Sequence, residues 1–385
     1  MRKTAVFVFV LLLSAFAYAD TITVTDMRGQ KVTIPKDPQR IATIDDGLVE
    51  GVMTHLGVID RVVAIGSWAM KRDYSYDFET IEGTKYTLRG WHTMKYLHPW
   101  LNELPCVNSP SGDILNYEAL AAVDPDLVIV RAGDCTVRSS DKAKMERTFT
   151  AIEALDIPLV VIFAPEGNDL STMKQELAVI GEIFGQKAKA ERLADYLFAT
   201  QTLIQERTAN MAEKPSLLYL ALDPNVRQTG GAGRVYGTNT PESYIIETVA
   251  NATNAFRSTG TNIPLSAEQI YAIDPDVIVL PTFNGYHPPR ELYDSKYFEI
   301  LSDLAAVKNK RIYAMPWSPM NCARRVEYPI DMLIVAKAAY PEQFKDIKLH
   351  DYVLQFYKDV YGVSDADART LRSEQLLDWM VEADF

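Results

Sequence analysis

Aromatic and basic side chains gather in the segments that directly follow the short apolar runs of this sequence. Arginine side chains bind carboxylates and oxyanions through paired hydrogen bonds, and aromatic faces accommodate flat or cationic groups. Ligands in parallel α/β folds lie beyond the carboxyl ends of the strands, so we expect these segments to build a binding site. For many of the side chains the alternative is a surface ion pair or a core contact. The candidate ligand-binding residues are Trp68, Arg72, Tyr74, Arg131, Arg227, Arg234, Tyr236, Tyr286, His287, Trp317, Arg324 and Arg325.

Five histidines are too few to favour direct capture of a bare transition metal. His55 and His350 are interpreted as structural residues. His92, His98 and His287 lie in the candidate loops, where they would complete the coordination of a chelated iron or nickel ion; otherwise they are solvated loop residues. A chain with a formal net charge of −12 that gathers arginines and aromatic rings near one site is expected to take an anionic metal chelate. The same negative charge disfavours a nucleic-acid partner.

The sequence offers no catalytic constellation. It contains no Gly-x-Ser-x-Gly elbow, no zinc-binding helix pair and no phosphate loop. The stretch Gly231–Gly233 lacks the spacing of a dinucleotide fingerprint and is interpreted as a turn. An enzyme, either a hydrolase or a chelatase, is therefore the rival class, and we expect a binding protein instead. A sensor domain would require an attached signalling module, which the sequence lacks.

An internal repeat indicates which elements position these loops. Residues 115–130 match residues 265–280, and both copies contain Asp-Pro-Asp between a helical pattern and a run of branched apolar residues. Asn116 and Ser266 are good helix N-caps, and Glu118 and Glu268 fall in the first turn, where the helix dipole favours an acid. Each copy predicts a short helix followed by a buried strand.

The apolar runs alternate with helical patterns, which predicts parallel sheets covered on both faces. We therefore expect an α/β fold with two parallel-sheet, Rossmann-like lobes joined by a long connecting α-helix. Gly181 and Gly185 weaken the middle of the connector, so two helices are an alternative. The expected strands cover residues 40–44, 62–65, 127–130, 159–162, 216–221, 277–280 and 311–314. The expected divisions are a signal peptide over 1–19, a first lobe over 20–168, the connector over 169–211 and a second lobe over 212–385.

The amino-terminal residues have the layout of a cleaved secretory signal. Arg2 and Lys3 precede an apolar run over residues 5–16 and a small-residue site ending at Ala19. No later stretch approaches the ~20 apolar residues of a membrane-spanning helix. We expect cleavage near Ala19 and a free periplasmic protein without a lipid anchor. In that oxidising compartment Cys106 and Cys135 could form a disulfide, although three free thiols are the simpler expectation.

The order of these motifs resembles a known family, the two-lobed solute-binding proteins of ABC importers that capture ferric siderophores, haem and cobalamin. The resemblance covers nearly all of the chain after residue 19. It rests on an opening hairpin pattern, both Asp-Pro-Asp units and several short motifs, at residues 21–35, 38–42, 115–130, 151–158, 182–185, 265–280 and 309–313.

The resemblance implies a ligand held between the lobes as cargo, no cofactor of the protein's own, little hinge closure and a monomer. It implies partners at the inner membrane, namely an ABC permease and its ATPase subunits. Arginines of the permease would contact Glu118 and Glu268; the alternative is that both are ordinary helix-start acids. Some similar proteins bind molybdate, so an oxyanion or a nickel chelate is the alternative cargo to a ferric siderophore or haem. The loop over residues 66–107 is longer than its counterpart in typical members, and we expect it to extend over the cleft mouth.

Overall fold

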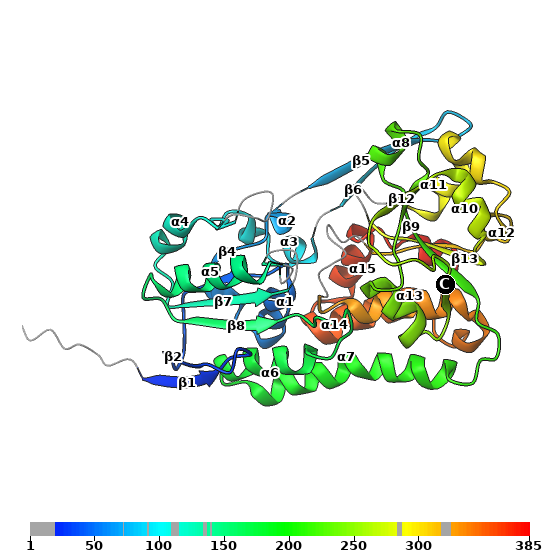
Figure 1. Cartoon of the computed structure of the whole chain (residues 1–385). Coiled ribbons are helices and arrows are strands. Elements are labelled where there is room, and N and C mark those ends of the chain that lie inside the picture. Colours follow the sequence, from blue (N-terminus) through cyan, green and yellow to red (C-terminus); the bar gives the residue numbers. More distant parts are fainter. Residues whose placement is uncertain are drawn as a thin grey trace, which may run out of the picture.

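The computed structural model describes residues 20–71, 73–90, 92–108, 115–133, 137–138, 141–282, 287–316 and 325–385, which fold into two α/β lobes (Figure 1). The signal peptide predicted for residues 1–19 lies outside the described residues. Within the described ranges, no helix has both the length and the apolar character that a membrane crossing requires.

The first lobe is built on a four-stranded parallel sheet in the order β4-β3-β7-β8. The strands coincide with four of the predicted apolar runs and are almost wholly buried: β3 (Ile41–Ile44), β4 (Val62–Ile65), β7 (Leu127–Ala132) and β8 (Leu159–Phe163). Helices and short helical turns connect them: α1 (Leu48–Leu56), η1 (Ile59–Arg61), α2 (Trp68–Lys71), α3 (Thr93–Leu97), η2 (Pro99–Asn102), α4 (Tyr117–Ala122) and α5 (Lys142–Glu153). An antiparallel hairpin of β1 (Thr21–Thr25) and β2 (Lys31–Pro35) precedes the sheet.

The second lobe has a mixed sheet in the order β12-β10-β9-β13-β14, with β11 (Thr253–Asn254) paired to β9. The predicted strands form its parallel part: β9 (Ser216–Ala221), β13 (Val277–Leu280) and β14 (Ile312–Ala314). The predicted parallel strands are extended at one edge by two strands that the sequence did not indicate, β10 (Gly233–Val235) and β12 (Ile263–Leu265), which pair antiparallel. These two strands have three residues each, too few to show a periodic pattern. At Gly233 a Cβ would lie only 2.7 Å from the backbone oxygen of Ala221, so glycine permits this pairing.

The helices of the second lobe pack on this sheet and on the connector. They are α8 (Pro224–Gln228), α9 (Pro241–Ser243), η3 (Tyr244–Val249), α10 (Ala267–Ile273), α11 (Pro289–Asp294), η4 (Lys296–Leu301), α12 (Ala305–Lys308), α13 (Tyr328–Ala339), η5 (Pro341–Phe344), α14 (Leu349–Tyr361), α15 (Asp365–Glu374) and α16 (Trp379–Glu382).

The connector between the lobes is a pair of helices, α6 (Met173–Ile183) and α7 (Lys187–Thr208). The chain turns at Gly185, whose φ of 63° lies in the left-handed region that glycine adopts without strain. At 1.5 Å per residue, the 22 residues of α7 span about 33 Å, and Figure 1 shows this helix running beneath both lobes.

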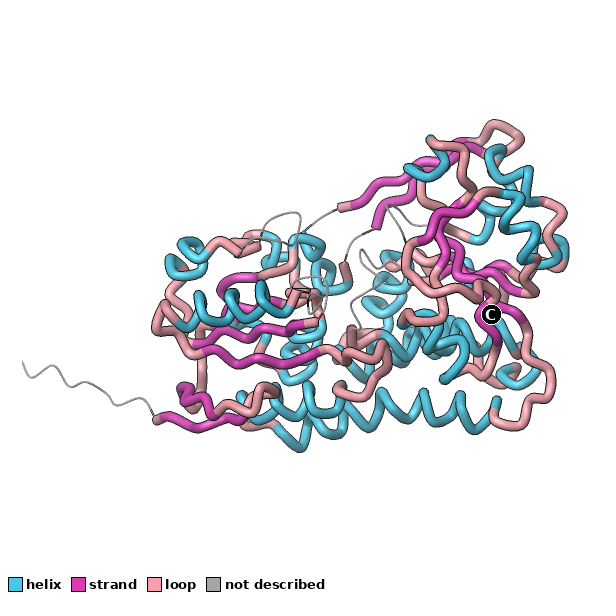
Figure 2. The backbone as a smooth tube through the Cα atoms, viewed as in Figure 1, coloured by secondary structure: helices cyan, strands magenta, loops and turns pink. Residues whose placement is uncertain are grey.

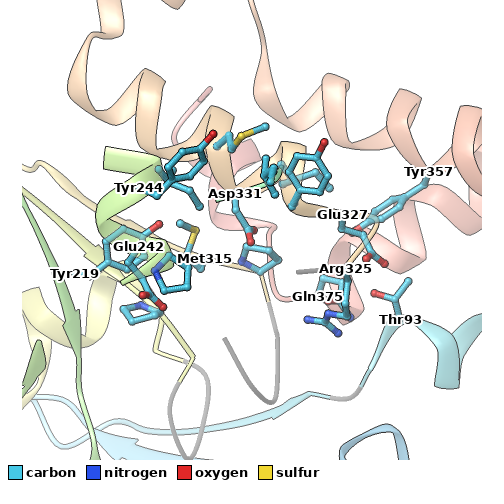
Figure 3. Close-up of a pocket in the computed structure, with 18 residues that line it drawn as sticks. Thr93, Tyr219, Glu242, Tyr244, Met315, Arg325, Glu327, Asp331, Tyr357 and Gln375 are labelled. Carbon is cyan, nitrogen blue, oxygen red and sulfur yellow. The ribbon is translucent and has the colours of Figure 1, made fainter. Parts of the chain in front are cut away.

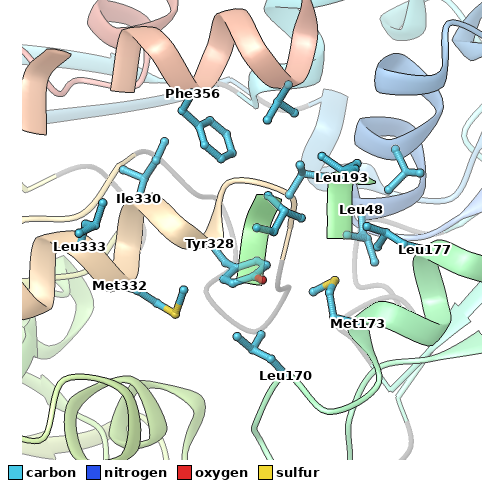
Figure 4. Packing of buried hydrophobic residues seen from close by; sticks show 14 of the residues in the cluster. Leu48, Leu170, Met173, Leu177, Leu193, Tyr328, Ile330, Met332, Leu333 and Phe356 are labelled. Atoms are coloured by element: carbon cyan, nitrogen blue, oxygen red, sulfur yellow. The ribbon is translucent and has the colours of Figure 1, made fainter. Parts of the chain in front are cut away.

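The largest apolar core is continuous between the lobes and the connector (Figure 4). It joins Leu48 of α1 with Leu177 of α6 and Leu193 of α7, and then with Ile330 and Phe356 of the second lobe. Separating the lobes on this side would expose apolar surface to water, which is unfavourable. The packing therefore favours a nearly fixed relative position of the lobes.

A second hairpin links the lobes on the side opposite α7. It consists of β5 (Tyr74–Glu79) and β6 (Lys85–Gly90), and in Figures 1 and 2 it runs from the first lobe towards the second. Near its tip, Thr80 pairs with Ser295, and the Ile81 amide donates to the carbonyl of Asp294 at 2.7 Å. Leu88 packs against the apolar cluster of the second lobe. We call residues 74–90 the strap.

Candidate functional site

A cavity opens at the carboxyl ends of the parallel strands of the second lobe (Figure 3). Pro281 follows β13 directly, and Met315 and Pro316 follow β14. The first turns of α13 form another wall, and Thr93 of α3 adds a residue from the first lobe. The lining residues are Thr93, Leu170, Tyr219, Pro241, Glu242, Tyr244, Ile245, Pro281, Met315, Pro316, Arg325, Glu327, Tyr328, Ile330, Asp331, Met332, Tyr357 and Gln375.

Arg325 is a buried cation of this cavity. It lies just before α13, and only 9% of the residue is exposed. Its Nη1 atom has no hydrogen-bond partner, and no carboxylate among the described residues lies within the 4.0 Å of an ion pair. Burying an arginine without a partner is costly. An anionic group of a bound ligand would supply the missing contact.

Asp331 is a carboxylate of the same wall, in the first turn of α13. Its Oδ1 atom has no hydrogen-bond partner. Burial raises its pKa to about 7; Arg325 opposes the shift, whereas Glu327 and Glu242 add to it. Asp331 is therefore close to half-protonated at neutral pH, and a nearby positive charge would favour its ionised form.

Tyrosine rings surround the acidic part of the cavity. Tyr219 of β9 lies with its ring 6.2 Å from that of Tyr236, in an edge-to-face contact. Burial raises the pKa of Tyr219 well above its ordinary value, and the charges of Asp331 and Glu242 raise it further, so the three side chains are neighbours. The Tyr328 hydroxyl has no hydrogen-bond partner. Carboxylates among aromatic rings are suited to binding a positively charged group.

The first lobe contributes a buried polar network behind Thr93. Ser67 donates to Asp46 at 2.7 Å, and Thr43 donates to Glu50. Burial raises the pKa of Asp46 to about 6, partly opposed by Arg325. Burial and then the Asp45 carboxylate raise the pKa of Glu50 well above its ordinary value. Asp46 interacts with Arg325 only through the electrostatic field, because the two side chains form no ion pair.

The structure brings few of the predicted ligand-binding residues to the cavity. Arg325 lines it, and Tyr236 contacts the ring of Tyr219 behind it. Arg131 is buried instead in the first lobe, where its Nε donates to Glu176 at 2.5 Å. Arg234 donates to Asp223 at 2.7 Å and to the carbonyl of Asn262 at 3.0 Å.

Trp68 lies on α2 and is 37% exposed. Tyr74 begins β5, and its side chain is outside the description. The remaining predicted ligand-binding residues lie outside the described residues: Arg72, Tyr286, Trp317 and Arg324.

Arg227 and His287 anchor the strap. Glu291 of α11 accepts hydrogen bonds from Tyr76 of the strap and, at 3.3 Å, from Arg227. Its other oxygen lies 2.8 Å from Nδ1 of His287. Arg227 also donates to the Tyr76 hydroxyl and stacks over the Tyr76 ring at 5.2 Å. A buried glutamate thus holds a tyrosine, an arginine and a histidine together.

The three histidines proposed to complete a metal site do not converge. His92 caps α3, with Nδ1 accepting from the Met94 amide at 3.1 Å, and burial holds its pKa well below the ordinary value. His98 contacts the Thr54 hydroxyl at 2.9 Å, and His287 belongs to the strap anchor. Among the described residues, no group of three histidine, cysteine or acidic side chains has the arrangement to hold a metal ion. Cys106 is a free thiol, and Cys135 lies outside the description.

Sequence reasoning missed the acidic and tyrosine walls of the cavity. The signal for Asp331 was present, because it interrupts the apolar run from Tyr328 to Ala339. A lone acid in such a run is costly unless it serves a site. Tyr219, Glu242 and Tyr244 had no comparable signal, because only the folded chain brings them together.

Glu118 and Glu268 occupy equivalent positions in the two repeat units. Each is exposed in the first turn of its helix, α4 or α10. Asn116 accepts from the Ala119 amide at 2.9 Å, and Ser266 forms a capping box with Gln269. The two caps explain why both helices begin where the sequence predicts. Both glutamates are exposed to solvent.

Comparison with known proteins identifies the family. A model of the family described as periplasmic binding protein matches residues 46–319. The molybdate-binding protein MolA of Haemophilus influenzae is 24% identical, with 92% of this chain and 95% of that protein aligned.

Solved structures share the fold. A periplasmic solute-binding protein from Veillonella parvula superposes with a TM-score of 0.72 at 24% identity, covering 93% of this chain and 99% of that one. Helicobacter pylori CeuE in its Ni-His complex superposes with a TM-score of 0.58 at 20% identity, covering 91% and 99%. At these identities the likeness establishes the fold and leaves the ligand open.

Proposed function

The chain belongs to the periplasmic binding protein family of ABC transport systems, and on that premise we propose that it captures a small metal complex in the cavity beside α13. It is a binding protein and not an enzyme, and its ligand is cargo for transport, not a cofactor. The observation that carries the proposal is the buried, unpartnered Arg325 in the wall of that cavity. Burying a charge without a partner destabilises a fold, and a bound ligand of opposite charge would supply that partner.

The place of the cavity supports the same proposal. It lies at the carboxyl ends of parallel strands, where α/β sheets bind ligands. Ferric siderophores and haem are the cargoes first expected from the sequence. A nickel chelate is a further candidate, because the structure of CeuE is that of a Ni-His complex.

An oxyanion is the second candidate cargo. MolA is a molybdate-binding protein, and an unpaired guanidinium is suited to an oxyanion. Molybdate would use Arg325 and leave the acid and tyrosine wall without a role. For that reason we rank it below a metal complex.

The test is to purify the protein without denaturation and identify any bound metal or chelate by native mass spectrometry. The emptied protein is then titrated with a ferric siderophore, haem, nickel–histidine and molybdate, followed by intrinsic fluorescence. Tight binding of one of them supports the proposal. Failure to bind all four, with no ligand carried through purification, would overturn it.

Delivery to a permease is the second part of the proposal. We propose that Glu118 and Glu268 contact arginines of the permease, that the protein works as a monomer in the periplasm after cleavage near Ala19, and that an ATPase drives uptake. Reversing both charges to lysine should abolish uptake while leaving cargo affinity unchanged. Normal uptake by the double variant would rule out this docking role.

A further inference from the structure

The strap belongs to the first lobe by its place in the sequence and to the second lobe by its contacts. It leaves the first lobe after α2 and returns to it before α3. The Tyr76 hydroxyl donates to Glu291, and Leu88 packs against the apolar cluster of the second lobe. Arg290 of α11 stacks over the Tyr86 ring at 4.8 Å. The strap is therefore an arm that crosses from one lobe to the other, as Figures 1 and 2 show.

The two faces of the strap differ in exposure. Its strands β5 and β6 pair antiparallel along their whole length, and successive side chains of a strand point to opposite faces. Tyr76 and Phe78 of β5 are buried, whereas Ser75, Asp77 and Glu79 are exposed. One face of the hairpin is thus shielded by the second lobe and the other faces solvent. With this geometry the hairpin can leave the second lobe as one unit, without breaking its own strand pairing.

The cavity lies between the shared core of the lobes and the base of the strap. Leu170 and Ile330 line the cavity and also belong to the core that joins the lobes to the connector. Thr93, the lining residue from the first lobe, comes three residues after Gly90, where β6 ends. Three residues span at most about 11 Å, so the strap ends close to the cavity wall. A bound ligand is therefore held between two attachments of the lobes, the core and the strap.

The strap is the attachment that can open without unfolding the protein. Its contacts to the second lobe include two hydrogen bonds that water can replace, from the Tyr76 hydroxyl to Glu291 and from the Ile81 amide to the Asp294 carbonyl. Local openings of this kind require less free energy than global unfolding. Separation at the shared core would instead expose the largest apolar cluster of the protein.

The anchor on the second lobe remains paired when the strap leaves. Glu291 is buried, and it keeps Arg227 at 3.3 Å and Nδ1 of His287 at 2.8 Å. Opening the strap therefore leaves no isolated charge in the second lobe, which would otherwise oppose the opening. The anchor is ready for the strap to bind again.

We propose that the strap is a latch between the lobes: it detaches from the second lobe to let cargo into and out of the cavity, and its reattachment retains the cargo. The lobes stay in place on their shared core, and the hairpin is the part that moves. The inference rests on the proposed function and adds the route by which cargo reaches the cavity.

The test is a reversible lock at the tip of the strap. Thr80 and Ser295 form an antiparallel bridge, and both are buried. Directly opposed residues of antiparallel strands lie at a Cα separation that a disulfide can span. The double variant Thr80→Cys/Ser295→Cys is therefore locked when oxidised and free when reduced. Wild type taken through the same oxidation and reduction controls for the native cysteines.

Stopped-flow fluorescence measures the entry and exit rates of a ferric siderophore, haem, nickel–histidine and molybdate. For each probe that binds, oxidation of the double variant should lower both rates at least about tenfold and change the affinity by less than about threefold. Tyr76→Phe, which removes the hydroxyl bound to Glu291, should raise both rates. The matched control Tyr86→Phe removes a hydroxyl from the same hairpin without removing a contact to Glu291, and it should leave both rates unchanged.

Hydrogen exchange of the empty protein gives a readout that needs no cargo. The Ile81 amide should exchange at least about tenfold faster than the amides of β9, which lies inside the second sheet, because it exchanges through opening of the strap alone. Oxidation of the double variant should slow the exchange of Ile81 and leave that of β9 unchanged.

Equal entry and exit rates in the oxidised and reduced double variant, with the disulfide confirmed by mass spectrometry, would overturn the latch and keep the proposed function. An Ile81 amide that exchanges as slowly as those of β9 would do the same. Failure of every probe to bind the wild type would overturn the proposed function, and the latch with it.

Discussion

Replacing Asp331 with asparagine should stabilise the empty protein, and increasingly so as the pH rises. Its pKa is raised from the ordinary 3.8 to about 7, chiefly by burial. In the unfolded chain the carboxyl ionises near pH 4, but in the folded protein it keeps its proton until about pH 7. The folded state therefore loses stability as the pH rises through this window.

The size of the effect follows from the two pKa values. A tenfold difference in proton affinity corresponds to about 1.4 kcal/mol, so the interval from 3.8 to about 7 corresponds to about 4 kcal/mol. Asp331 is partly exposed to the cavity, which reduces the expected gain to about 2 kcal/mol. Asparagine has no charge to bury at any pH. Its advantage should be near zero at pH 4 and complete above pH 8.

Urea unfolding of the empty wild type and of Asp331→Asn at pH 5, 7 and 9 measures this difference. The control Asp365→Asn, at an exposed position, should change stability by less than about 0.5 kcal/mol at each pH. A difference between Asp331→Asn and wild type that stays constant from pH 5 to pH 9 would refute the reasoning. A variant less stable than wild type at pH 9 would refute it as well.

Two other predictions address the strap and the connector. Glu291→Ala should cost about 3 kcal/mol in urea unfolding and expose residues 79–85 to proteases, because it leaves the mostly buried guanidinium of Arg227 without its carboxylate; wild-type resistance in that segment would count against the anchor. Gly185→Ala should cost about 1 kcal/mol in the same assay, because alanine is strained at a φ of 63°, and an unchanged midpoint would argue against the turn.

The parallel part of both sheets was predictable because its strands are continuous apolar runs. β7 and β13 follow identical Asp-Pro-Asp signals, and their burial makes the pattern unambiguous. The strands β10 and β12 have only three residues each, too few to show a pattern of apolar residues. The pairing of β10 with β9 also requires the backbone at Gly233 to lie close to Ala221, which the sequence around Gly233 does not indicate. The break at Gly185 was visible in the sequence as a choice between one helix and two.

The site was predictable in position but not in composition. Ligands of parallel α/β folds lie beyond the carboxyl ends of the strands, and this rule selected the loops after β13 and β14. Arg325 lies in the second of these loops and lines the cavity. The same rule also selected Arg227 and His287, whose side chains instead contact Glu291 in the anchor of the strap. Arg227 and Glu291 are 64 residues apart in the sequence, and only folding brings their side chains together. The spacing of neighbouring residues therefore cannot predict this ion pair.

The strap also limits how the lobes of this protein can be exchanged with those of its relatives. The first lobe supplies Tyr76 and Leu88 to the surface of the second, and the second supplies the glutamate that binds Tyr76 and the apolar cluster that contacts Leu88. A chimaera made by joining residues 20–168 to a relative's second lobe would carry a hairpin with no matching anchor. Residues 74–90 belong to the first lobe in sequence, but their side chains contact the second lobe. A stable chimaera must therefore transfer them together with Arg227 and Glu291.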